Sequence, residues 1–161
     1  MQRVFSGKMT RVMDITALGE LLIDFTDCGL SENGKRIFEQ NPGGAVCNVL
    51  AAAAKRGKST AFIGKVGNDM HGKYLRDTLV SCGINTQGLI LADDVFTTLA
   101  FVALNNGERS FSFARKPGAD TCLLAKEVNN DLLHNSRIFH VGSLSLTDEP
   151  ARGATLAAVK A

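Results

Sequence analysis

The chain has 161 residues, of which 45% are apolar and 21% charged, and its formal net charge is +2. These values fit one globular domain with a well-formed core. So small a net charge argues against a nucleic-acid partner or an anionic membrane surface, and no apolar run approaches the length of a membrane span.

The cysteines and histidines indicate neither a disulfide framework nor a metal site. No C-x-x-C pair occurs among Cys28, Cys47, Cys82 and Cys122, so we expect reduced thiols in a cytoplasmic protein. The three histidines lack metal-ligand spacing. Residues 1–11 contain no long apolar core, and we expect a frayed extension there rather than a signal peptide.

Residues 14–25 form a short, almost continuous apolar run, which is typical of a strand buried on both faces. Gly19 and Glu20 interrupt the run, and the strand is expected to resume at Leu21. Asp24 ends this segment, where a carboxylate is costly to bury without a partner. It is either a surface turn residue or an acceptor for hydroxyl groups. The polar residues 30–40 are expected to form a loop.

A glycine pair leads into a helix within residues 41–57. Pro42 prevents the helix from beginning earlier, and Gly43 and Gly44 have no Cβ, so a bound molecule can approach their backbone. The N–H groups at the start of such a helix can bind hydroxyls or anions, and Asn48 adds a polar side chain one turn later. The alternative is that the glycine pair is only a tight turn.

The next segments alternate in type. Residues 59–66 read as a strand, and Asn68 or Asp69 caps a helix that runs to Cys82 and ends at Gly83. Strand, helix, strand and helix in this order predict parallel βαβ units with right-handed crossovers.

An antiparallel hairpin follows. Residues 97–104 alternate with a period of two, Asn106-Gly107 is a strong hairpin turn signal, and residues 109–115 return. Two strands alone cannot bury their apolar face, so this hairpin should lie on a ligand cleft, on the core or on another subunit. Arg115 has the same parity as Phe113 and can present a cation beside an aromatic ring.

The last third predicts a helix over residues 123–135, a strand over 137–141, and a final helix capped by Thr147 or Asp148 with Pro150 in its first turn. Gly57-Lys58-Ser59-Thr60 is not a phosphate-binding P-loop, because it leaves a helix and enters a strand. The chain also lacks a dinucleotide-binding fingerprint and a G-x-S-x-G nucleophile elbow.

Together these segments resemble the N-terminal half of a ribokinase-like (PfkB family) carbohydrate kinase, and within that family most of all a fructokinase. The resemblance covers residues 14–161, and the order and spacing of its motifs make it specific. The motifs are Gly19-Glu20-Leu21-Leu22-Ile23-Asp24-Phe25, Pro42-Gly43-Gly44-Ala45 with Asn48, Gly64-Lys65-Val66-Gly67-Asn68-Asp69 with Gly72, Gly107-Glu108-Arg109-Ser110-Phe111, Phe113-Ala114-Arg115, Ala119-Asp120 and His140-Val141-Gly142-Ser143.

The resemblance implies an α/β fold, with a Rossmann-type three-layer body, truncated here, and an inserted small antiparallel β-sheet that acts as a lid. Residues 1–161 would be the N-terminal part of one ribokinase-like domain. Lid elements are expected at about 19–40 and about 95–116, within the usual uncertainty of element boundaries.

The sugar would lie between the body and the lid. By resemblance, Asp24 accepts hydrogen bonds from sugar hydroxyls, Gly43 and Gly44 let the sugar lie against the backbone, and Asn48 binds another hydroxyl. From the lid, the resemblance implies that Phe101 and Phe113 cover the apolar face of the sugar.

Arg115 would reach the hydroxyl or carbonyl end of the sugar. One departure from the family is Phe113, which stands where related keto-sugar kinases often have tyrosine.

The reaction that the resemblance implies is the phosphorylation of fructose to fructose 6-phosphate by ATP with Mg²⁺. The catalytic base and most of the ATP site of such kinases lie in their C-terminal half, which this chain does not include. No catalytic residue is therefore assigned, and the chain alone is expected to be inactive. The strand at 137–141 is expected to expose an apolar edge.

Two alternatives remain open. The chain could belong to a kinase for 2-keto-3-deoxygluconate, ribose or adenosine, or it could be a non-catalytic module that binds sugar or dimerises. Lids of this family can pair between subunits, so a homodimer through the β-lid is a possible partner arrangement.

Overall fold

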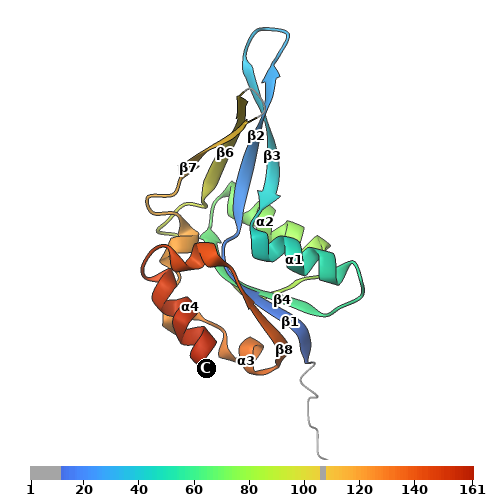
Figure 1. The fold of residues 1–161 in the computed structure, drawn as a ribbon, viewed down its shortest axis with the longest axis vertical. Helices are drawn as coiled ribbons and strands as arrows, with labels where there is room; N and C mark the ends of the chain where they lie inside the picture. The colour runs from blue at the N-terminus through green and yellow to red at the C-terminus, as the bar shows by residue number, and fades with distance from the viewer. Residues whose placement is uncertain (1–11, 106–107) are drawn as a thin grey trace, which may run out of the picture.

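The computed structural model describes residues 12–105 and 108–161. It forms a layered α/β body and a second, narrower sheet that projects from one end of the body (Figure 1). The frayed extension and the Asn106-Gly107 turn that the sequence predicts lie outside the described residues. No helix of the described residues is long and apolar enough to cross a lipid bilayer.

The body is built on a parallel sheet with strand order β5-β4-β1-β8. Its strands are β1 (Met13–Leu18), β4 (Thr60–Gly67), β5 (Asn85–Ala92) and β8 (Ser136–Val141). Helices α1 (Ala45–Ala54) and α2 (Met70–Ser81) cover one face, while α3 (Asn130–His134), α4 (Ala151–Lys160) and short 3-10 turns lie on the other (Figure 1). The expected three-layer architecture is therefore present.

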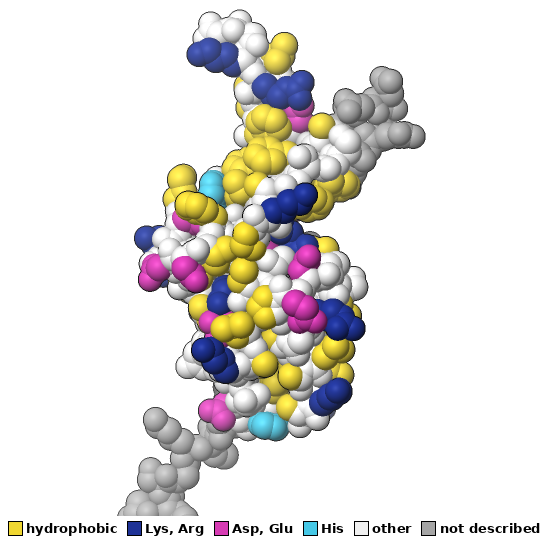
Figure 2. All heavy atoms as spheres, turned by 90° about the vertical axis from the view of Figure 1, so that its left-hand side faces the viewer, with side chains coloured by type: hydrophobic (Ala, Val, Ile, Leu, Met, Phe, Trp, Pro, Cys, Tyr) yellow, Lys and Arg dark blue, Asp and Glu magenta, His cyan; other side chains and the backbone are white. Residues whose placement is uncertain are grey.

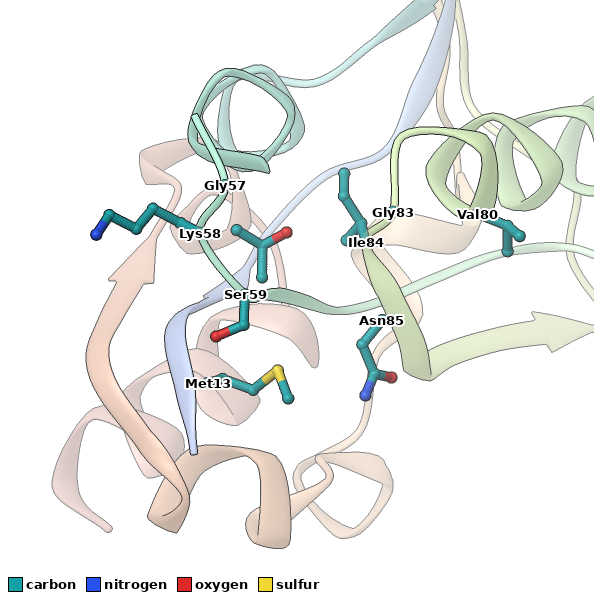
Figure 3. A pocket seen from close by; sticks show the side chains of 9 residues that line it. Met13, Gly57, Lys58, Ser59, Val80, Gly83, Ile84 and Asn85 are labelled. Atoms are coloured by element: carbon teal, nitrogen blue, oxygen red, sulfur yellow. The ribbon is translucent and has the colours of Figure 1, made fainter. Parts of the chain in front are cut away.

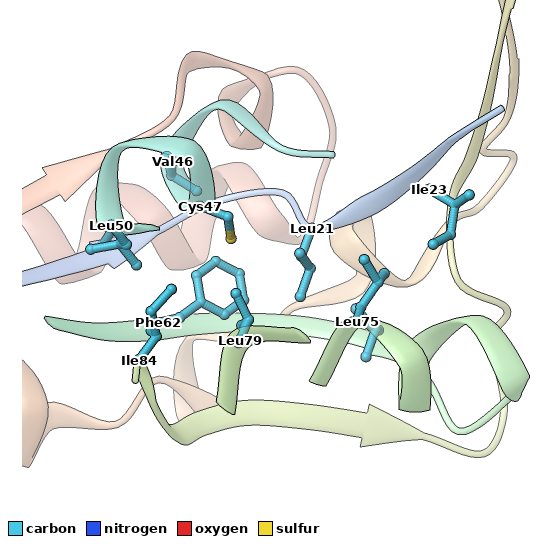
Figure 4. Close-up of a cluster of buried hydrophobic side chains, with 11 residues drawn as sticks. Leu21, Ile23, Val46, Cys47, Leu50, Phe62, Leu75, Leu79 and Ile84 are labelled. Carbon is cyan, nitrogen blue, oxygen red and sulfur yellow. The ribbon is translucent and has the colours of Figure 1, made fainter. Parts of the chain in front are cut away.

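Two apolar cores lie on the two faces of this sheet. On one face, Phe62 and Val66 of β4 pack against Leu50 of α1 and Leu75 of α2 (Figure 4). On the other face, Ile63 is the central residue of a second cluster that includes Ala151, Ala154 and Ala158 of α4. Successive residues of β4 point to opposite faces of the sheet, and each face carries an apolar core. Side chains on both faces must therefore be apolar, which explains the continuous apolar run of this strand.

The second sheet, which we call the lid, has the strand order β3-β2-β6-β7. Its strands are β2 (Leu22–Leu30), β3 (Arg36–Gly43), β6 (Leu99–Asn105) and β7 (Glu108–Ala114). β2 pairs antiparallel with β3 and parallel with β6, and β6 pairs antiparallel with β7. The predicted hairpin is therefore half of a larger sheet, whose other half follows β1 directly.

The prediction of a loop over residues 30–40 is wrong. β3 begins at Arg36 and pairs with β2 as far as Gly43, and the turn between them is closed by Ser31 N–H, which donates to Lys35 O at 2.7 Å. Residues 36–39 are exposed, so no apolar alternation marks the strand in the sequence. This strand is held by backbone hydrogen bonds to β2 and not by the burial of its side chains.

The helix expected over residues 123–135 is also wrong. This stretch follows the 3-10 turn η1 (Ala119–Cys122) and contains only the turn η2 (Ala125–Glu127) and the short helix α3. Leu124 and Val128 have extended backbones, and the Glu127 carboxylate accepts from Leu124 N–H and from buried Lys65. These contacts fix the segment against β4 in a form that a continuous helix could not adopt.

Two further differences concern β5 and α4. β5 was not predicted, because its first residues Asn85, Thr86 and Gln87 are polar and Gly88 follows them. At α4, the N-cap residue is Pro150, and the Glu149 carboxylate accepts the N–H of Gly153 in the first turn of the helix. The side chains of Thr147 and Asp148, expected as caps, instead accept hydrogen bonds from Arg115.

Candidate functional site

The strand order of the body marks one place where a ligand crevice is expected. From β1 the chain moves to β4 and β5 on one side, and then returns to β8 on the other side of β1. The carboxyl ends of β1 and β8 therefore flank the topological switch point, the usual ligand site in open α/β sheets. Gly19 and Gly142 follow these two strands, and Gly142 N–H donates to Leu18 O at 3.1 Å.

The glycine pair of the sequence lies beside this crevice. Gly44 precedes α1 with a φ of +126°, a conformation available in practice only to glycine. A Cβ on Gly44 would lie 2.5 Å from the carbonyl oxygen of Glu20, and a Cβ on Gly43 would lie 2.3 Å from Oδ2 of Asp24. The backbone of the pair is thus pressed between the start of α1 and the first strand of the lid.

Glu20 is a buried carboxylate at the centre of this arrangement, with 4% of its surface exposed. Its Oε1 accepts the N–H of Ala45 at 2.8 Å, which satisfies one of the free donors at the start of α1. Its Oε2 is buried without a hydrogen-bond partner among the described residues, and a Cβ on Gly142 would lie 2.7 Å from it. Glu20 therefore joins α1 to the end of β8, a role that the sequence analysis missed.

The lid presents one face toward this crevice. Directly paired residues point to the same side of a sheet, so Asn41, Asp24, Ala100 and Phe113 form one row across its four strands. Gly43, which pairs with Leu22 in the next row on the same face, is in contact with the Asp24 carboxylate. We call this side of the lid the Asp24 face.

Asp24 is half-buried, and no hydrogen bond from the described residues reaches its carboxylate. Burial raises the pKa of this carboxyl above its ordinary value, because the charged form loses solvation. An incompletely satisfied carboxylate on a partly covered face is suited to accept hydrogen bonds from hydroxyl groups of a ligand.

Phe101 does not lie on the Asp24 face. It pairs with Phe25 and Ser112, one residue out of step with Asp24 and Phe113, and so points to the other side of the lid. There it stacks on Phe25 at 5.4 Å and meets Phe38 edge-on at 5.8 Å. Ala100 and Val102, its neighbours in β6, lie on the Asp24 face instead, where the resemblance had predicted that Phe101 would cover the sugar.

The other predicted residues divide between the two sides of the crevice. Phe113 is on the Asp24 face, 49% exposed, and stacks on Phe111 at 6.2 Å. Asn48 lies on α1 one turn after Gly44 and, with Gly43, lines a cavity of about 90 Å³ between α1 and α2. Its side chain is exposed, and no hydrogen bond of the described residues joins it to Asp24.

Arg115 reaches across the Asp24 face but is already engaged. Its side chain is 12% exposed and donates to Asp120, Leu144 O, Thr147 and Asp148. Since Leu144, Thr147 and Asp148 follow β8 in the body, the Asp24 face overlies the carboxyl end of β8. The structure does not bring the guanidinium to Asp24 as a free donor.

The opposite face of the lid rests on α2. Phe25 packs edge-on against His71 at a centroid distance of 5.7 Å. Asp69 caps α2 by accepting from His71 N–H and Gly72 N–H, and it also accepts from the backbone and hydroxyl of Thr97, just before β6. Burial raises the pKa of Asp69, but these hydrogen bonds outweigh it and leave the pKa below its ordinary value.

The widest cavity described, about 640 Å³, is unrelated to these residues. It lies at the amino ends of β4 and β5, where α1 and α2 end, and is lined by small side chains and backbone that include Gly57, Ser59 and Gly83 (Figure 3). Lys58, its one charged lining residue, extends away from the others (Figure 3). Ligand sites in this fold class lie at the opposite edge of the sheet.

The described residues offer no metal site, because no three His, Cys, Asp or Glu side chains among them converge on one position. The start of α1 is not a free phosphate site either, since Glu20 occupies the N–H of Ala45. The residues present therefore do not fit Mg²⁺ or the phosphates of ATP, and no step through these groups follows from them.

Large apolar side chains are exposed on both faces of the lid. Figure 2 shows basic, acidic and apolar side chains interspersed over the body, and apolar side chains on the lid below basic ones near its tip. Among the lid residues that the structure describes, the exposed apolar side chains include Leu30, Ile37, Phe38, Phe111 and Phe113, of which Phe111 and Phe113 lie on the Asp24 face.

Comparison with known proteins places this geometry in context. A family model described as pfkB family carbohydrate kinase matches residues 13–161. Fructokinase-2 from Oryza sativa subsp. japonica is 45% identical over 152 residues, which cover 91% of this chain and 45% of that protein.

Two crystal structures share the fold. A fructokinase from Xylella fastidiosa has a TM-score of 0.87 and 36% identity, covering 92% of this chain and 47% of that chain. A fructokinase from Vibrio cholerae O395, in a form with bound fructose, ADP and calcium ion, has a TM-score of 0.76 and 30% identity, covering 92% and 46%. The chain spans about half the length of the relatives it matches.

Proposed function

The chain belongs to the pfkB family of carbohydrate kinases and has a ribokinase-like fold, and on that premise we propose that it is the sugar-binding part of a fructokinase. The whole protein would transfer a phosphoryl group from ATP to the 6-hydroxyl of fructose. The similarity to named fructokinases over 91% of the chain favours fructose among the sugars of the family.

One observation carries the proposal: Asp24 lies directly over Gly43, on the side of the lid that faces the switch-point crevice. A carboxylate beside bare glycine backbone on one face suits a small polyol, because its hydroxyls can donate to the carboxylate while its ring lies against the backbone. We assign sugar binding to Asp24, Gly43, Gly44, Asn48 and Phe113. Ala100 and Val102 join them as the small apolar floor of the lid, in place of Phe101.

The rest of the kinase chemistry is assigned to a C-terminal half beyond this chain. There we place the catalytic base, the ATP pocket and the Mg²⁺ ion, which the described residues do not provide. Residues 1–161 are then the first part of one ribokinase-like domain, with lid elements at 22–43 and 99–114, and are inactive alone. Mg²⁺ would neutralise the charge that develops on the transferred phosphoryl group.

A phosphorylation assay tests the proposal. The 161-residue chain and a version extended to the family's length of about 300 residues are given ATP, Mg²⁺ and a panel of fructose, ribose, adenosine and 2-keto-3-deoxygluconate. We expect turnover of fructose in the longer form alone. Preference for another sugar would move the protein to a different branch of the family, and binding without turnover in both forms would favour a non-catalytic module.

We also propose that the lid forms a homodimer. The exposed apolar residues of the lid, among them Ile37, Phe38 and Phe111, support this arrangement, because exposed apolar patches mark interaction sites. Cysteines without a disulfide pattern support a cytoplasmic location. Sedimentation velocity of the longer protein tests this proposal. If the lid is the interface, the native protein should sediment as a dimer and the variant Phe38→Ser as a monomer.

A further inference from the structure

Arg115 follows β7 and directs its guanidinium into a ring of protein acceptors. Nε donates to Oδ2 of Asp120 at 2.9 Å, and Nη2 lies 2.8 Å from the same oxygen in an ion pair. Nη1 donates to Thr147 Oγ1 and to Asp148 Oδ2, each at 3.3 Å, and Nη2 donates to Leu144 O at 3.3 Å. Each of the three nitrogens of the guanidinium is therefore engaged by a protein acceptor.

The two ends of this arrangement differ in strength. The Asp120 side chain is 1% exposed and makes short, charge-assisted bonds with Arg115. The Asp148 side chain is 55% exposed, and all contacts on that side are longer. Water competes for the second set and not for the first, so the Asp120 end is the fixed one.

Asp120 is fixed because it also holds the other lid strand. Its Oδ1 accepts from the hydroxyl of Thr98, just before β6. Ala119 N–H donates to Phe96 O at 2.9 Å, and a Cβ on Gly118 would lie 1.8 Å from Thr98 Oγ1, so the two segments are in close contact. The base of β6 and the end of β7 are thereby joined through one buried carboxylate.

We propose that Arg115 is a positioning residue that latches the lid to the segment 144–148, with Asp120 as its fixed anchor. The segment follows Gly142 at the switch point, so the latch sets how closely the Asp24 face approaches the crevice. When the lid opens, the contacts to Leu144, Thr147 and Asp148 break, while the pair with Asp120, whose turn η1 packs against β4, stays formed at the base of the lid.

Amide hydrogen exchange of the full chain without sugar tests the latch. The variant Thr147→Val/Asp148→Ala removes both acceptors of Nη1 and leaves the sugar-binding residues unchanged. We expect exchange of the β6 and β7 amides to rise roughly tenfold, with no change in β4, since local opening of the lid becomes easier. Arg152→Ala, which removes an exposed cation from α4, is the control and should change neither region.

A second variant, Arg115→Lys, keeps the charge beside Asp120 but lacks the planar fork needed for the other contacts. It should raise lid exchange in the same way. Unchanged lid exchange in either variant would overturn the proposal, and so would an equal rise in β4, which would mean a loss of overall stability. Because no sugar is present, failure of the fructokinase assignment would not affect the result.

Discussion

Gly44 is held in a strained backbone conformation against the carbonyl of Glu20. In Gly44→Ala, the φ of +126° and the 2.5 Å contact would both be unfavourable, and we expect a loss of about 3 kcal/mol in the free energy of unfolding. Urea denaturation measures this loss.

Gly57→Ala is the matched control, because Gly57 also has a positive φ of +78° but nothing within 4 Å of its Cβ position. The loss there should be only about 1 kcal/mol. Similar losses at the two positions would mean that the close contact with Glu20 adds nothing to the cost of the substitution.

The charged form of Asp24 lowers the stability of the folded protein by an amount that depends on pH. Its pKa is raised in the folded state by burial, so the folded protein binds this proton more tightly than the unfolded chain. The charged carboxylate therefore lowers stability above the folded pKa, and this cost disappears as the pH falls below the ordinary value of 3.8.

We accordingly expect Asp24→Asn to raise the urea midpoint at neutral pH, by an amount that shrinks to nothing near pH 3.8. Midpoints measured over this pH range decide it. A gain that does not depend on pH would show that the charge of Asp24 is not its cause. A loss at neutral pH would show that the charged carboxylate stabilises the folded protein.

At this scale the sequence analysis found individual residues but not the contacts between them. Asp24, Gly43 and Gly44 could be identified because a carboxylate after an apolar run and a glycine pair before a helix are local signals. Glu20 had no such signal, since its partner Ala45 is 25 residues away along the chain. The engagement of Arg115 was missed for the same reason, as its acceptors on the body are 29 to 33 residues away.

At the scale of elements, strand register decides which lid residues can meet a ligand. Phe101 packs on Phe25 and Phe38, whereas Phe113 is half-exposed on the Asp24 face. We expect Phe101→Ala to cost about 2 kcal/mol in the free energy of unfolding and Phe113→Ala about 0.5–1 kcal/mol. Thermal and urea denaturation of the two variants measure these losses.

For sugar binding we expect the reverse order, with the larger effect at Phe113. Phe113→Ala should weaken fructose binding, and Phe101→Ala should leave it nearly unchanged under conditions where the protein is folded. If Phe101→Ala abolished binding in a folded protein, the face assignment from the strand register would be wrong.

The elements of the body were easier to predict than those of the lid. β4 and α2 combine apolar periodicity with a clear cap at Asp69 and a clear stop at Gly83, so their positions follow from local chemistry. β3 is defined by its pairing with β2 and β5 by its pairing with β4, and their exposed or polar residues carry no periodic signal. The segment 119–134 depends on the buried pair of Lys65 and Glu127, which no local pattern reveals.

At the scale of the whole molecule, β8 is an edge strand in the part of the chain that the structure describes. Ile138 on this strand is 57% exposed, and an exposed apolar edge favours association. We expect the 161-residue chain to self-associate and Ile138→Lys to reduce the association, as measured by sedimentation velocity. Val80→Lys on α2, where the native residue is equally exposed at 57%, should have no effect.

The predicted overall arrangement, parallel units with an inserted antiparallel hairpin, is present, because the order of elements limits an α/β chain to few topologies. The pairing of β2 with β6 could not be predicted, since it joins segments more than 70 residues apart, as in Ile23↔Leu99. This pairing turns two separate ribbons into one lid and brings Asp24 and Phe113 to the same face.

The most direct test of the sugar-binding crevice is a calorimetric titration of the chain with fructose, beside Asp24→Asn and Asp27→Asn. Asp27 is on the same strand but the opposite face, and pairs with Arg36 at 2.9 Å. We predict saturable binding by the native chain and by Asp27→Asn, and an affinity at least about tenfold lower for Asp24→Asn. Equal affinities for the two variants, or no fructose binding by the native chain, would contradict the account.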